Sequence, residues 1–487
     1  MRPLSIWMTA AEVAPYAQTG GLADVLRALP PALAKRGHEV KVILPAYGGI
    51  DRRGFAFDPA EDHLDVPVGI ARVPVRTVSR RLAERVTLTL LVNEELFGRR
   101  GYYGTGGGDF PDNARRFSCL AAATVALAAR AARTPDVLHG HDWHAGLLPL
   151  FARAARGWRD GRAPRTVHTI HNMGYQGHFA DRDIDWVAPA GRLREAVFRT
   201  EGIEYRGGIN YMKAALVYAD RITAVSPRYA WEITTREGGF GLQDVARQRG
   251  AALSGILNGA DYDRWDPARD PHLAERYDAR SLDRKEASRA ALRAAFGLGE
   301  EEPARPILGV VSRLVDQKGI DLVLEASPWL LRNGADLVVL GSGDPRLVEG
   351  LENLRRIHPT RVGVFIGFNE ALSHKVVAGS DLLLIPSRYE PCGLVQMHAM
   401  RYGTIPVVHR TGGLADTVRD EGEQPGRGTG FVFDGVDAGS LAYAVERAVT
   451  LRATEPPRWE ALRSRAVAAD FSWDRSAAEY EALYRSL

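Results

Sequence analysis

Residues 306–322, PILGVVSRLVDQKGIDL, contain the pattern that decides the fold. An apolar run at 306–311 is followed by the polar residues Ser312 and Arg313 and then by a segment of helical character. Short apolar runs of this kind are typical of strands buried inside a parallel sheet. The segment therefore predicts one strand–turn–helix unit with its polar residues at the turn.

The same alternation of strand and helix extends from this segment through the whole chain. The second half predicts a helix at 282–296 and further strands at 336–340, 362–365, 382–385 and 406–408. The first half predicts helices at 22–37 and 113–132, a hairpin insertion within 55–95, and strands at 4–8, 40–44, 136–139, 165–170 and 221–225. The pattern restarts near residue 255. We therefore expect two α/β domains, each built on a parallel, doubly wound sheet.

Composition and charge narrow the class of protein. At roughly 100–200 residues per domain, a chain of 487 residues corresponds to two or three domains. The hydrophobic fraction of 45% and the charged fraction of 25% are ordinary for a globular chain and exclude a mainly disordered one. A net charge of only +3, without a basic tail, argues against a nucleic-acid partner.

The cysteines and the N-terminal residues give no sign of export. Cys119 and Cys392 lie far apart, and no CxxC or Cys/His spacing indicates a zinc site. A reducing compartment is the simplest interpretation, so we expect a cytoplasmic location. The apolar run at 4–8 is too short for a signal peptide and is soon followed by Glu12. No run of about 18 apolar residues occurs, so we expect no membrane partner.

Polar residues stand where the predicted strands end. They are His141 and Asp142, His171 and Asn172 in the first half, and Arg313 and Glu390 in the second. Open α/β sheets bind ligands beyond the carboxyl ends of their strands. We therefore expect a site shared across a cleft between the two domains.

Two glycine pairs, Gly20-Gly21 and Gly412-Gly413, each begin a predicted helix. Bare backbone N–H groups at a helix N-terminus favour anions. The sequence TGGLAD occurs at both places, at 19–24 and at 411–416, which favours two related sites facing each other over a chance repeat. The chain has no GxxxxGK[ST] motif and no GxGxxG after its first strand, so neither a P-loop nor a nicotinamide site is expected.

Arg313 and Lys318 lie five residues apart across the predicted strand-to-helix turn. A guanidinium fork and an ammonium point charge that converge there suit a diphosphate. The alternative is a solvated surface pair. Because the chain has only six lysines, at positions 35, 41, 213, 285, 318 and 375, we favour the functional interpretation.

A second turn, Glu390-Pro391-Cys392-Gly393-Leu394, follows a buried strand. Proline would fix the turn after Glu390, and Gly393 would let a backbone N–H group approach a ligand. An ordinary capped turn is the alternative, and Cys392 alone is more typical of a small buried residue than of a nucleophile.

Histidines and aromatic residues gather near the strand that ends at His139. His139, His141 and His144 are close in sequence, but their spacing does not indicate a metal site, and none is expected. Tyr102, Tyr103 and Trp143 are loop aromatics that belong either to the core or to surfaces that stack on sugar rings.

Taken together, the motifs resemble those of the bacterial glycogen synthases and plant starch synthases, glycosyltransferases of the GT-B fold. The telling segments are TGGLADV (19–25), HGHDWHAGL (139–147), TIHNMGYQG (169–177), SRLVDQKGIDL (312–322), SRYEPCGLVQMHAMRYG (387–403) and RTGGLADTV (410–418). The resemblance covers nearly the whole chain. It implies two Rossmann-like, doubly wound domains facing across a cleft: an acceptor domain at 1–254, joined by a C-terminal helix at 471–487, and a nucleotide-sugar donor domain at 255–470.

The resemblance also implies a reaction. Glucose would pass from ADP-glucose to the non-reducing end of an α-1,4-glucan such as glycogen, with retention of configuration and without a metal or other cofactor. Arg313 and Lys318 would bind the diphosphate, Glu390 would contact the donor glucose, and the main chain of His171 would approach the anomeric carbon. Fixed cations lower the barrier because the leaving group develops negative charge.

Further binding residues follow from the same resemblance. For the donor they are Gln18, Gly20, Gly21, Asp24, Asn172, Asn258, Phe368, Cys392, Gly393, Leu394, Thr411, Gly412 and Gly413, with Phe368 placed against adenine. For the sugar or acceptor they are Asp142, Tyr102, Tyr103, Trp143 and His144.

Gln18 departs from the family pattern, which usually has lysine two residues before the first glycine pair. A glutamine donates a neutral hydrogen bond but does not neutralise a phosphate, and loss of a charge-assisted bond costs roughly 1.5–3 kcal/mol. Weaker donor binding, or a different donor, is therefore an open alternative.

Three other functions stay open at this point. A catalytically weakened glucan-binding protein is one, although Arg313, Lys318 and Glu390 argue against it. A related transferase with a UDP- or GDP-sugar donor is another. A phosphorylase shares the fold but is longer and needs a cofactor-bearing lysine late in the chain, where only Lys375 follows Lys318.

Overall fold

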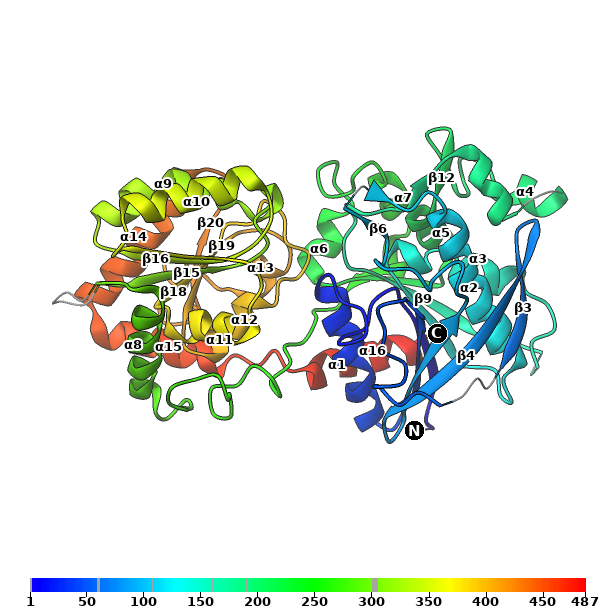
Figure 1. Ribbon diagram of the computed structural model, residues 1–487, viewed down its shortest axis with the longest axis horizontal. Helices are drawn as coiled ribbons and strands as arrows, with labels where there is room; N and C mark the ends of the chain where they lie inside the picture. The colour runs from blue at the N-terminus through cyan, green and yellow to red at the C-terminus, as the bar shows by residue number, and fades with distance from the viewer. Residues whose placement is uncertain (1, 59–61, 107, 160, 189–190, 300–304) are drawn as a thin grey trace. The chain divides into compact units, whose positions relative to one another are not determined.

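The computed structural model describes residues 2–58, 62–106, 108–159, 161–188, 191–299 and 305–487. The chain divides into two compact units, coloured along the chain in Figure 1. Unit 1 comprises Met1–Gly259 and Trp473–Leu487, and unit 2 comprises Ala260–Ser472. The sequence-based boundaries were 254/255 and 470/471, so each observed boundary lies a few residues later.

Unit 1 is built on a nine-stranded sheet with the order β14-β13-β9-β8-β1-β2-β5-β4-β3. Its strands are β1 Ser5–Thr9, β2 Glu39–Pro45, β3 His63–Val68, β4 Ala71–Ala83, β5 Val86–Val92, β8 Val137–His141, β9 Arg165–Ile170, β13 Arg221–Ala224 and β14 Leu253–Gly255. Neighbours from β14 to β5 pair in parallel, as predicted, with Ser5 opposite Glu39 in the β1–β2 register.

The antiparallel strands β3, β4 and β5 confirm the hairpin predicted within 55–95. Strand β5 pairs in parallel with β2, and β4 and β3 continue the same sheet in antiparallel fashion. Alternate residues of β3 and β4, among them Leu64 and Val73, are buried, so this hairpin extends the main sheet and shares its core. Residues 59–61 of the predicted segment lie outside the described residues.

The helices of unit 1 cover its sheet and carry its loops. They are α1 Gly21–Lys35, α2 Asn113–Arg130, α3 Leu148–Ala154, α4 Gly191–Val197, α5 Tyr211–Tyr218, α6 Pro227–Glu232, α7 Gln243–Gln248 and α16 Trp473–Arg485. Two small sheets add β10 His178–Phe179, β12 Gly208–Asn210 and β11 Glu204–Tyr205, and the pair β6 Gly104–Thr105 and β7 Gly108–Asp109. Within the described residues of both units, no helix has the length and apolar character needed to cross a membrane.

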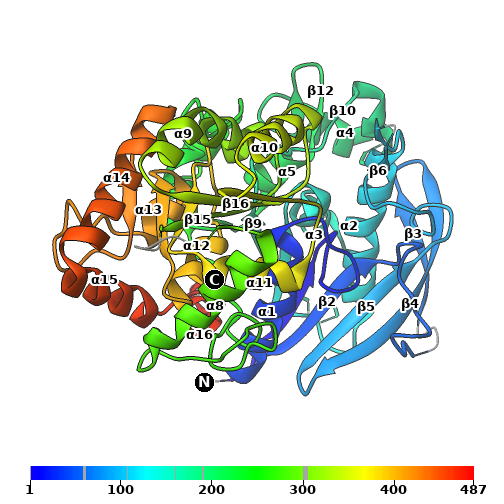
Figure 2. The same ribbon diagram turned by 60° about the vertical axis from the view of Figure 1, so that its left-hand side comes forward.

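The C-terminal helix α16 completes the core of unit 1 and lies beside α1 in both Figure 1 and Figure 2. Tyr480 and Tyr484 are buried among residues of the first strands. Arg36 Nε donates to Glu481 Oε2 at 2.6 Å, and the Tyr484 hydroxyl lies 2.8 Å from His139 Nδ1. The last residues of the chain therefore fold as part of its first domain.

Unit 2 is built on a six-stranded sheet with the order β17-β16-β15-β18-β19-β20, parallel throughout. Its strands are β15 Ile307–Val311, β16 Asp336–Gly341, β17 Val362–Ile366, β18 Leu382–Ile385, β19 Ile405–His409 and β20 Phe431–Phe433. Its helices are α8 Lys285–Phe296, α9 Ile320–Arg332, α10 Pro345–Ile357, α11 Glu370–Gly379, α12 Val395–Arg401, α13 Gly412–Thr417, α14 Ala438–Thr454 and α15 Pro456–Ala468.

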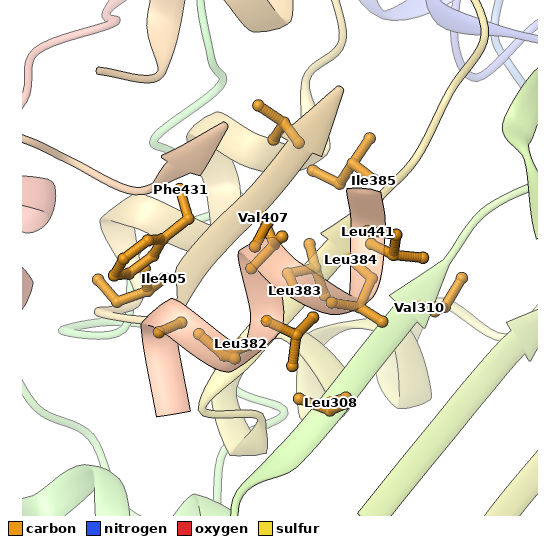
Figure 3. Packing of buried hydrophobic residues seen from close by; sticks show 14 of the residues in the cluster. Leu308, Val310, Leu382, Leu383, Leu384, Ile385, Ile405, Val407, Phe431 and Leu441 are labelled. Atoms are coloured by element: carbon orange, nitrogen blue, oxygen red, sulfur yellow. The ribbon is translucent and has the colours of Figure 1, made fainter. Parts of the chain in front are cut away.

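Both faces of the unit 2 sheet are covered, which confirms the doubly wound prediction. Leu308 of β15 packs in a cluster with residues of α9 and α14, and Figure 3 labels Leu308, Leu441 of α14 and side chains of β18 as members of this cluster. Ile307, one residue earlier, packs with Leu292 of α8 and Val376 of α11. Successive residues of a strand point to opposite faces, so helices on both sides are required to bury them.

The contact between Tyr484 and His139 generates a prediction about the role of α16. Tyr484→Phe removes the hydroxyl and leaves His139 Nδ1 buried without this partner, which should cost about 1–3 kcal/mol of unfolding free energy. Guanidinium unfolding followed by tryptophan fluorescence measures the shift in midpoint. Tyr443→Phe, at an exposed position on α14, is the control and should not move it. Equal midpoints for Tyr484→Phe and wild type would contradict the packing role.

Candidate functional site

In unit 2 the predicted cation and the predicted carboxylate bind each other. Lys318 Nζ lies 2.5 Å from Glu390 Oε2, and Ser387 Oγ donates to the same oxygen at 2.9 Å. Glu390 is only 8% exposed. A buried carboxylate needs such partners, because an unpaired charge is costly away from water. The arrangement brings the loop after β15 and the loop after β18 to one point.

The two loops are fixed to each other by further contacts. Gly319 adopts a φ of +65°, and a Cβ atom there would lie 2.1 Å from the Pro386 carbonyl oxygen. The Arg388 guanidinium binds both carboxylate oxygens of Asp321, at 2.9 and 2.6 Å. The backbone N–H of Arg388 donates to the Gln317 carbonyl at 2.8 Å. Lys318 therefore stands on a rigid turn.

The second glycine pair supports the backbone of Glu390. Gly412 has a φ of +43°, and a Cβ atom there would lie 2.0 Å from the Glu390 carbonyl oxygen. The Gly413 N–H donates to that same oxygen at 3.1 Å, so it is engaged within the protein in this structure. His409 Nδ1 lies 2.8 Å from the carbonyl oxygen of Ser387 and holds the start of the same loop.

The other predicted donor residues of unit 2 differ in exposure. Cys392 and Thr411 are buried, while Gly393 and Leu394 are half-buried at the start of α12. The Phe368 side chain is 84% exposed, after β17. Arg313 is exposed as well, with a guanidinium nitrogen 3.4 Å from Gln317 Oε1. Phe368 and Arg313 therefore offer side chains directly to solvent.

In unit 1, Asp142 organises the backbone after β9. Its Oδ1 accepts from the N–H of His171 at 2.7 Å and from that of Asn172 at 3.2 Å. Asp142 has a φ of +53°, a left-handed conformation that is uncommon for a residue with a side chain. Burial raises the pKa of its carboxyl to about 7, although the two N–H donors act in the opposite direction. Asp142 thus positions the His171 main chain.

Four histidines form a buried group beside this point: His139, His141, His168 and His171. His141 Nδ1 lies 3.0 Å from His171 Nε2, and the nitrogens of His139 contact Tyr484 and Thr169. Burial lowers the pKa of His168 and of His171 to about 3, and it lowers that of His139 and His141 well below the usual value. All four are therefore neutral at pH 7.

The N-terminus of α1 has a partner that the sequence did not reveal. Glu12, a buried residue, accepts from the N–H groups of Thr19 at 2.6 Å and of Gly20 at 3.2 Å, both through Oε2. The Tyr103 hydroxyl donates to its Oε1 at 2.6 Å. Glu12 lies within the otherwise uncharged segment 10–17, AAEVAPYA, which is the signal that could have found it. The protein thus supplies its own carboxylate to part of the predicted anion site.

The remaining predicted donor residues of unit 1 surround this turn. Gln18 is exposed, and its Nε2 lies 3.4 Å from each carboxylate oxygen of Asp24. A Cβ atom at Gly20 or at Gly21 would meet nothing within 4 Å, in contrast to the packed glycines 412 and 413. Asn258 is buried, and its Oδ1 has no hydrogen-bond partner among the residues that the structure describes.

The predicted sugar-binding aromatics pack mainly on one another. Trp143 is 9% exposed and His144 is 6% exposed. Tyr103 stacks on His144 at a centroid distance of 4.4 Å, and Tyr102 meets Tyr47 edge-on at 5.0 Å. The rings of Trp143 and His144 therefore pack mainly against protein, with Phe117 edge-on to both.

Comparison with known proteins gives consistent matches over both units. A family model described as the starch synthase catalytic domain matches residues 5–248, and one described as glycosyl transferases group 1 matches residues 296–464. The chain is 46% identical over 487 residues to a glycogen synthase of Anaeromyxobacter sp. (strain Fw109-5), covering 99% of each chain. It is 42% identical to a glycogen synthase of Granulibacter bethesdensis, covering 100% of this chain and 99% of that one.

Solved structures agree with the sequence matches. The catalytic domain of starch synthase IV from Arabidopsis thaliana, bound to ADP and acarbose, superposes with a TM-score of 0.88 at 32% identity, covering 100% of this chain and 99% of that one. A sucrose-phosphate synthase from Thermosynechococcus elongatus has a TM-score of 0.59 at 20% identity, covering 99% and 98%, and shares the fold.

The buried histidines generate a prediction about acid stability. An unfolded histidine binds a proton near pH 6.5, whereas folded His168 does so near pH 3, so stability falls as the pH drops from about 6.5 toward 3. Each such histidine removes about 1.4 kcal/mol per pH unit within that window. His168→Leu should therefore flatten the dependence of unfolding free energy on pH between 6.5 and 5.

Urea unfolding at half-unit pH steps measures that slope. His63→Leu, at an exposed position of unit 1, is the matched control and should keep the wild-type slope. An unchanged slope in His168→Leu would mean that His168 does not contribute to acid sensitivity.

Proposed function

The chain belongs to the glycogen synthase and starch synthase family of glycosyltransferases, and we propose that it transfers glucose from ADP-glucose to the non-reducing end of an α-1,4-glucan such as glycogen, with retention at the anomeric carbon. The observation that carries the proposal is the junction of Lys318 and Glu390, with Arg313 on the same turn. ADP in the related starch synthase structure supports an adenine nucleotide donor, and acarbose there supports a glucan-like acceptor.

Unit 2 is the proposed donor-binding unit. Arg313 and Lys318 would bind the diphosphate and stabilise the charge that develops on departing ADP. Glu390 would contact the donor glucose from the same loop, with its backbone held by Gly412 and Gly413. The exposed ring of Phe368 suits a stacking contact with adenine.

Unit 1 is the proposed source of the groups that contact the reacting sugar. Asp142 accepts from two backbone N–H groups, so it fixes the main chain of His171, the group proposed to approach the anomeric carbon. Asn172 follows directly and would contact glucose. Departure of ADP and attack by the acceptor on the same face of the sugar would account for retention without a carboxylate nucleophile.

The proposal also covers the cofactors, partners and cellular location of the reaction. It needs no cofactor, and no nucleic acid or membrane is proposed as a partner. Cys119 and Cys392 are both buried and form no disulfide within the described residues, which agrees with the proposed cytoplasmic location.

One observation favours an alternative in which the protein binds ADP-glucose weakly or uses a different nucleotide-sugar donor. Gln18 brings no positive charge to the N-terminus of α1, and the N–H groups of Thr19 and Gly20 already bind Glu12. The alternatives are therefore a retaining transferase with another nucleotide-sugar donor and a glucan-binding homologue with little activity.

The ion pair generates a prediction about turnover. Lys318→Ala should lower kcat for transfer from ADP-glucose to glycogen by about 10²–10³-fold, because a fixed cation at the leaving group is lost. Initial rates at saturating donor measure it, and Arg313→Ala should also reduce them. Lys375→Ala, at a half-buried position on α11, is the matched control and should keep its rate. A near wild-type rate for Lys318→Ala, with normal circular dichroism, would refute the assigned role.

Position 18 generates a prediction about donor affinity. Gln18→Lys should lower KM for ADP-glucose by up to about tenfold, which corresponds to about 1.4 kcal/mol of regained attraction. Asp24 lies beside the amide of Gln18 and would pair with part of the new charge, so a smaller gain is also consistent. Gln18→Met, of similar length without charge, should not lower KM.

Two results would count against this interpretation of position 18. An unchanged or raised KM in Gln18→Lys would mean that the side chain is not near the phosphates. Glycogen binding without transfer by either form would favour the glucan-binding alternative, and a donor screen with glycogen as acceptor would identify a different nucleotide sugar.

A further inference from the structure

A cluster of two histidines and one glutamate in unit 2 is not used by the proposed transfer reaction. We propose that His272, Glu370 and His374 form a binding site for a divalent transition-metal ion, with Zn²⁺ as the reference ion. Glu370 and His374 lie on α11, and His272 lies in the segment that precedes α8. One ligand atom from each residue lies within 4.8 Å of the other two.

The helix presents two of the three ligands on one face. Glu370 and His374 are four residues apart, and side chains at this spacing on a helix are neighbours. Zn²⁺ binds nitrogen and oxygen at about 2.0–2.2 Å, so tetrahedral ligand atoms lie roughly 3.4 Å apart. The ligand atoms of the three residues are at most 4.8 Å apart here, so each distance exceeds the tetrahedral value by at most about 1.4 Å. Rotation of the half-buried side chains of His272 and Glu370 can close that difference.

One buried carboxylate contacts the imidazole of His374 and the backbone of His272. Asp270 Oδ2 lies 2.6 Å from His374 Nδ1, and Asp270 Oδ1 accepts from the backbone N–H of His272 at 2.8 Å. The Tyr402 hydroxyl also donates to Oδ2, at 2.5 Å. A carboxylate on the far nitrogen of a histidine is the usual support of a metal ligand, because it fixes the tautomer that presents the other nitrogen.

The other nitrogen of His374 lacks a partner. His374 is only 2% exposed, and among the described residues its Nε2 has no hydrogen-bond partner. Trp265 stacks on the imidazole at a centroid distance of 3.7 Å and an interplanar angle of 9°, which fixes the ring. A buried nitrogen left without a partner is unfavourable, and a metal ion would satisfy it.

The kind of ligand atoms in the cluster determines which type of metal ion it would bind. Glu370, whose Oε1 binds Arg264, contributes one carboxylate oxygen to the cluster. Two imidazole nitrogens and one carboxylate oxygen suit Zn²⁺ and similar transition metals, whereas Mg²⁺ and Ca²⁺ prefer oxygen ligands alone. With three protein ligands, water would complete four-coordination.

The consequence of binding would be structural. The ion would join the segment around His272 to α11, two parts of unit 2 that are about a hundred residues apart in the sequence. None of the three ligands belongs to the residues proposed for glucose transfer. Metal binding should therefore raise thermal stability without being required for the reaction.

The test uses the full chain without an affinity tag, freed of metal by a chelator. Titration with ZnCl₂ by calorimetry should show one site per chain, and His272→Ala should weaken the affinity at least tenfold. Glu370→Gln, which keeps the size of the side chain, should also weaken it. His358→Ala, at a half-buried position of the same unit, is the matched control and should bind as wild type does.

Two further measurements separate this site from adventitious binding. Saturating Zn²⁺ should raise Tm by about 5 °C or more in wild type and in His358→Ala, but not in His272→Ala or Glu370→Gln. Co²⁺ should give the visible absorption bands of a four-coordinate ion, and excess Mg²⁺ should not displace it. Wild-type affinity and Tm shift in both ligand variants, or the lack of a one-to-one site in wild type, would overturn the proposal.

Discussion

Burial of both faces of the parallel sheets is the constraint on which the rest of the structure depends. Residues 382–385 of β18 are all buried, so this strand has no room for an unpaired polar side chain. The carboxylates proposed for the reaction accordingly lie in loops that follow strands. Glu390 follows β18, and Asp142 follows β8, which is buried along its whole length. Both residues therefore lie at the carboxyl edge of their sheet.

The repeated TGGLAD sequence shows that local sequence alone does not determine the use of a glycine pair. Gly412 and Gly413 are in contact with the loop 390–392, and one of them has a positive φ. Glycine is required there, because a side chain would meet backbone oxygen. Gly20 and Gly21 have open space around them and begin the fifteen-residue helix α1. The first pair leaves room for a ligand, whereas the second supports a neighbouring loop.

The continuous apolar run at 382–385 predicted β18 from the sequence, and the more mixed segment predicted as a strand at 165–170 matches β9. The hairpin within 55–95 was also predicted, but its place in the main sheet was not, because that place depends on the pairing of β5 with β2, which no local pattern encodes. The pairing of Lys318 with Glu390 joins residues 72 positions apart and was likewise hidden. Glu12 was missed because its role depends on backbone N–H groups and not on a motif.

The contacts of Glu390 and Glu12 determine where positive charge is left to bind the donor phosphates. Glu390 is buried and needs Lys318, so a bound diphosphate would have to share that ammonium with the carboxylate or replace it. At the N-terminus of α1, the carboxylate of Glu12 already occupies two N–H groups, and Gln18 adds no charge. Under the proposed function, the attraction for the donor phosphates therefore rests mainly on unit 2. There the exposed guanidinium of Arg313 has, among the described residues, only a 3.4 Å contact with a neutral amide, so it can turn toward a phosphate without breaking an ion pair with any of them.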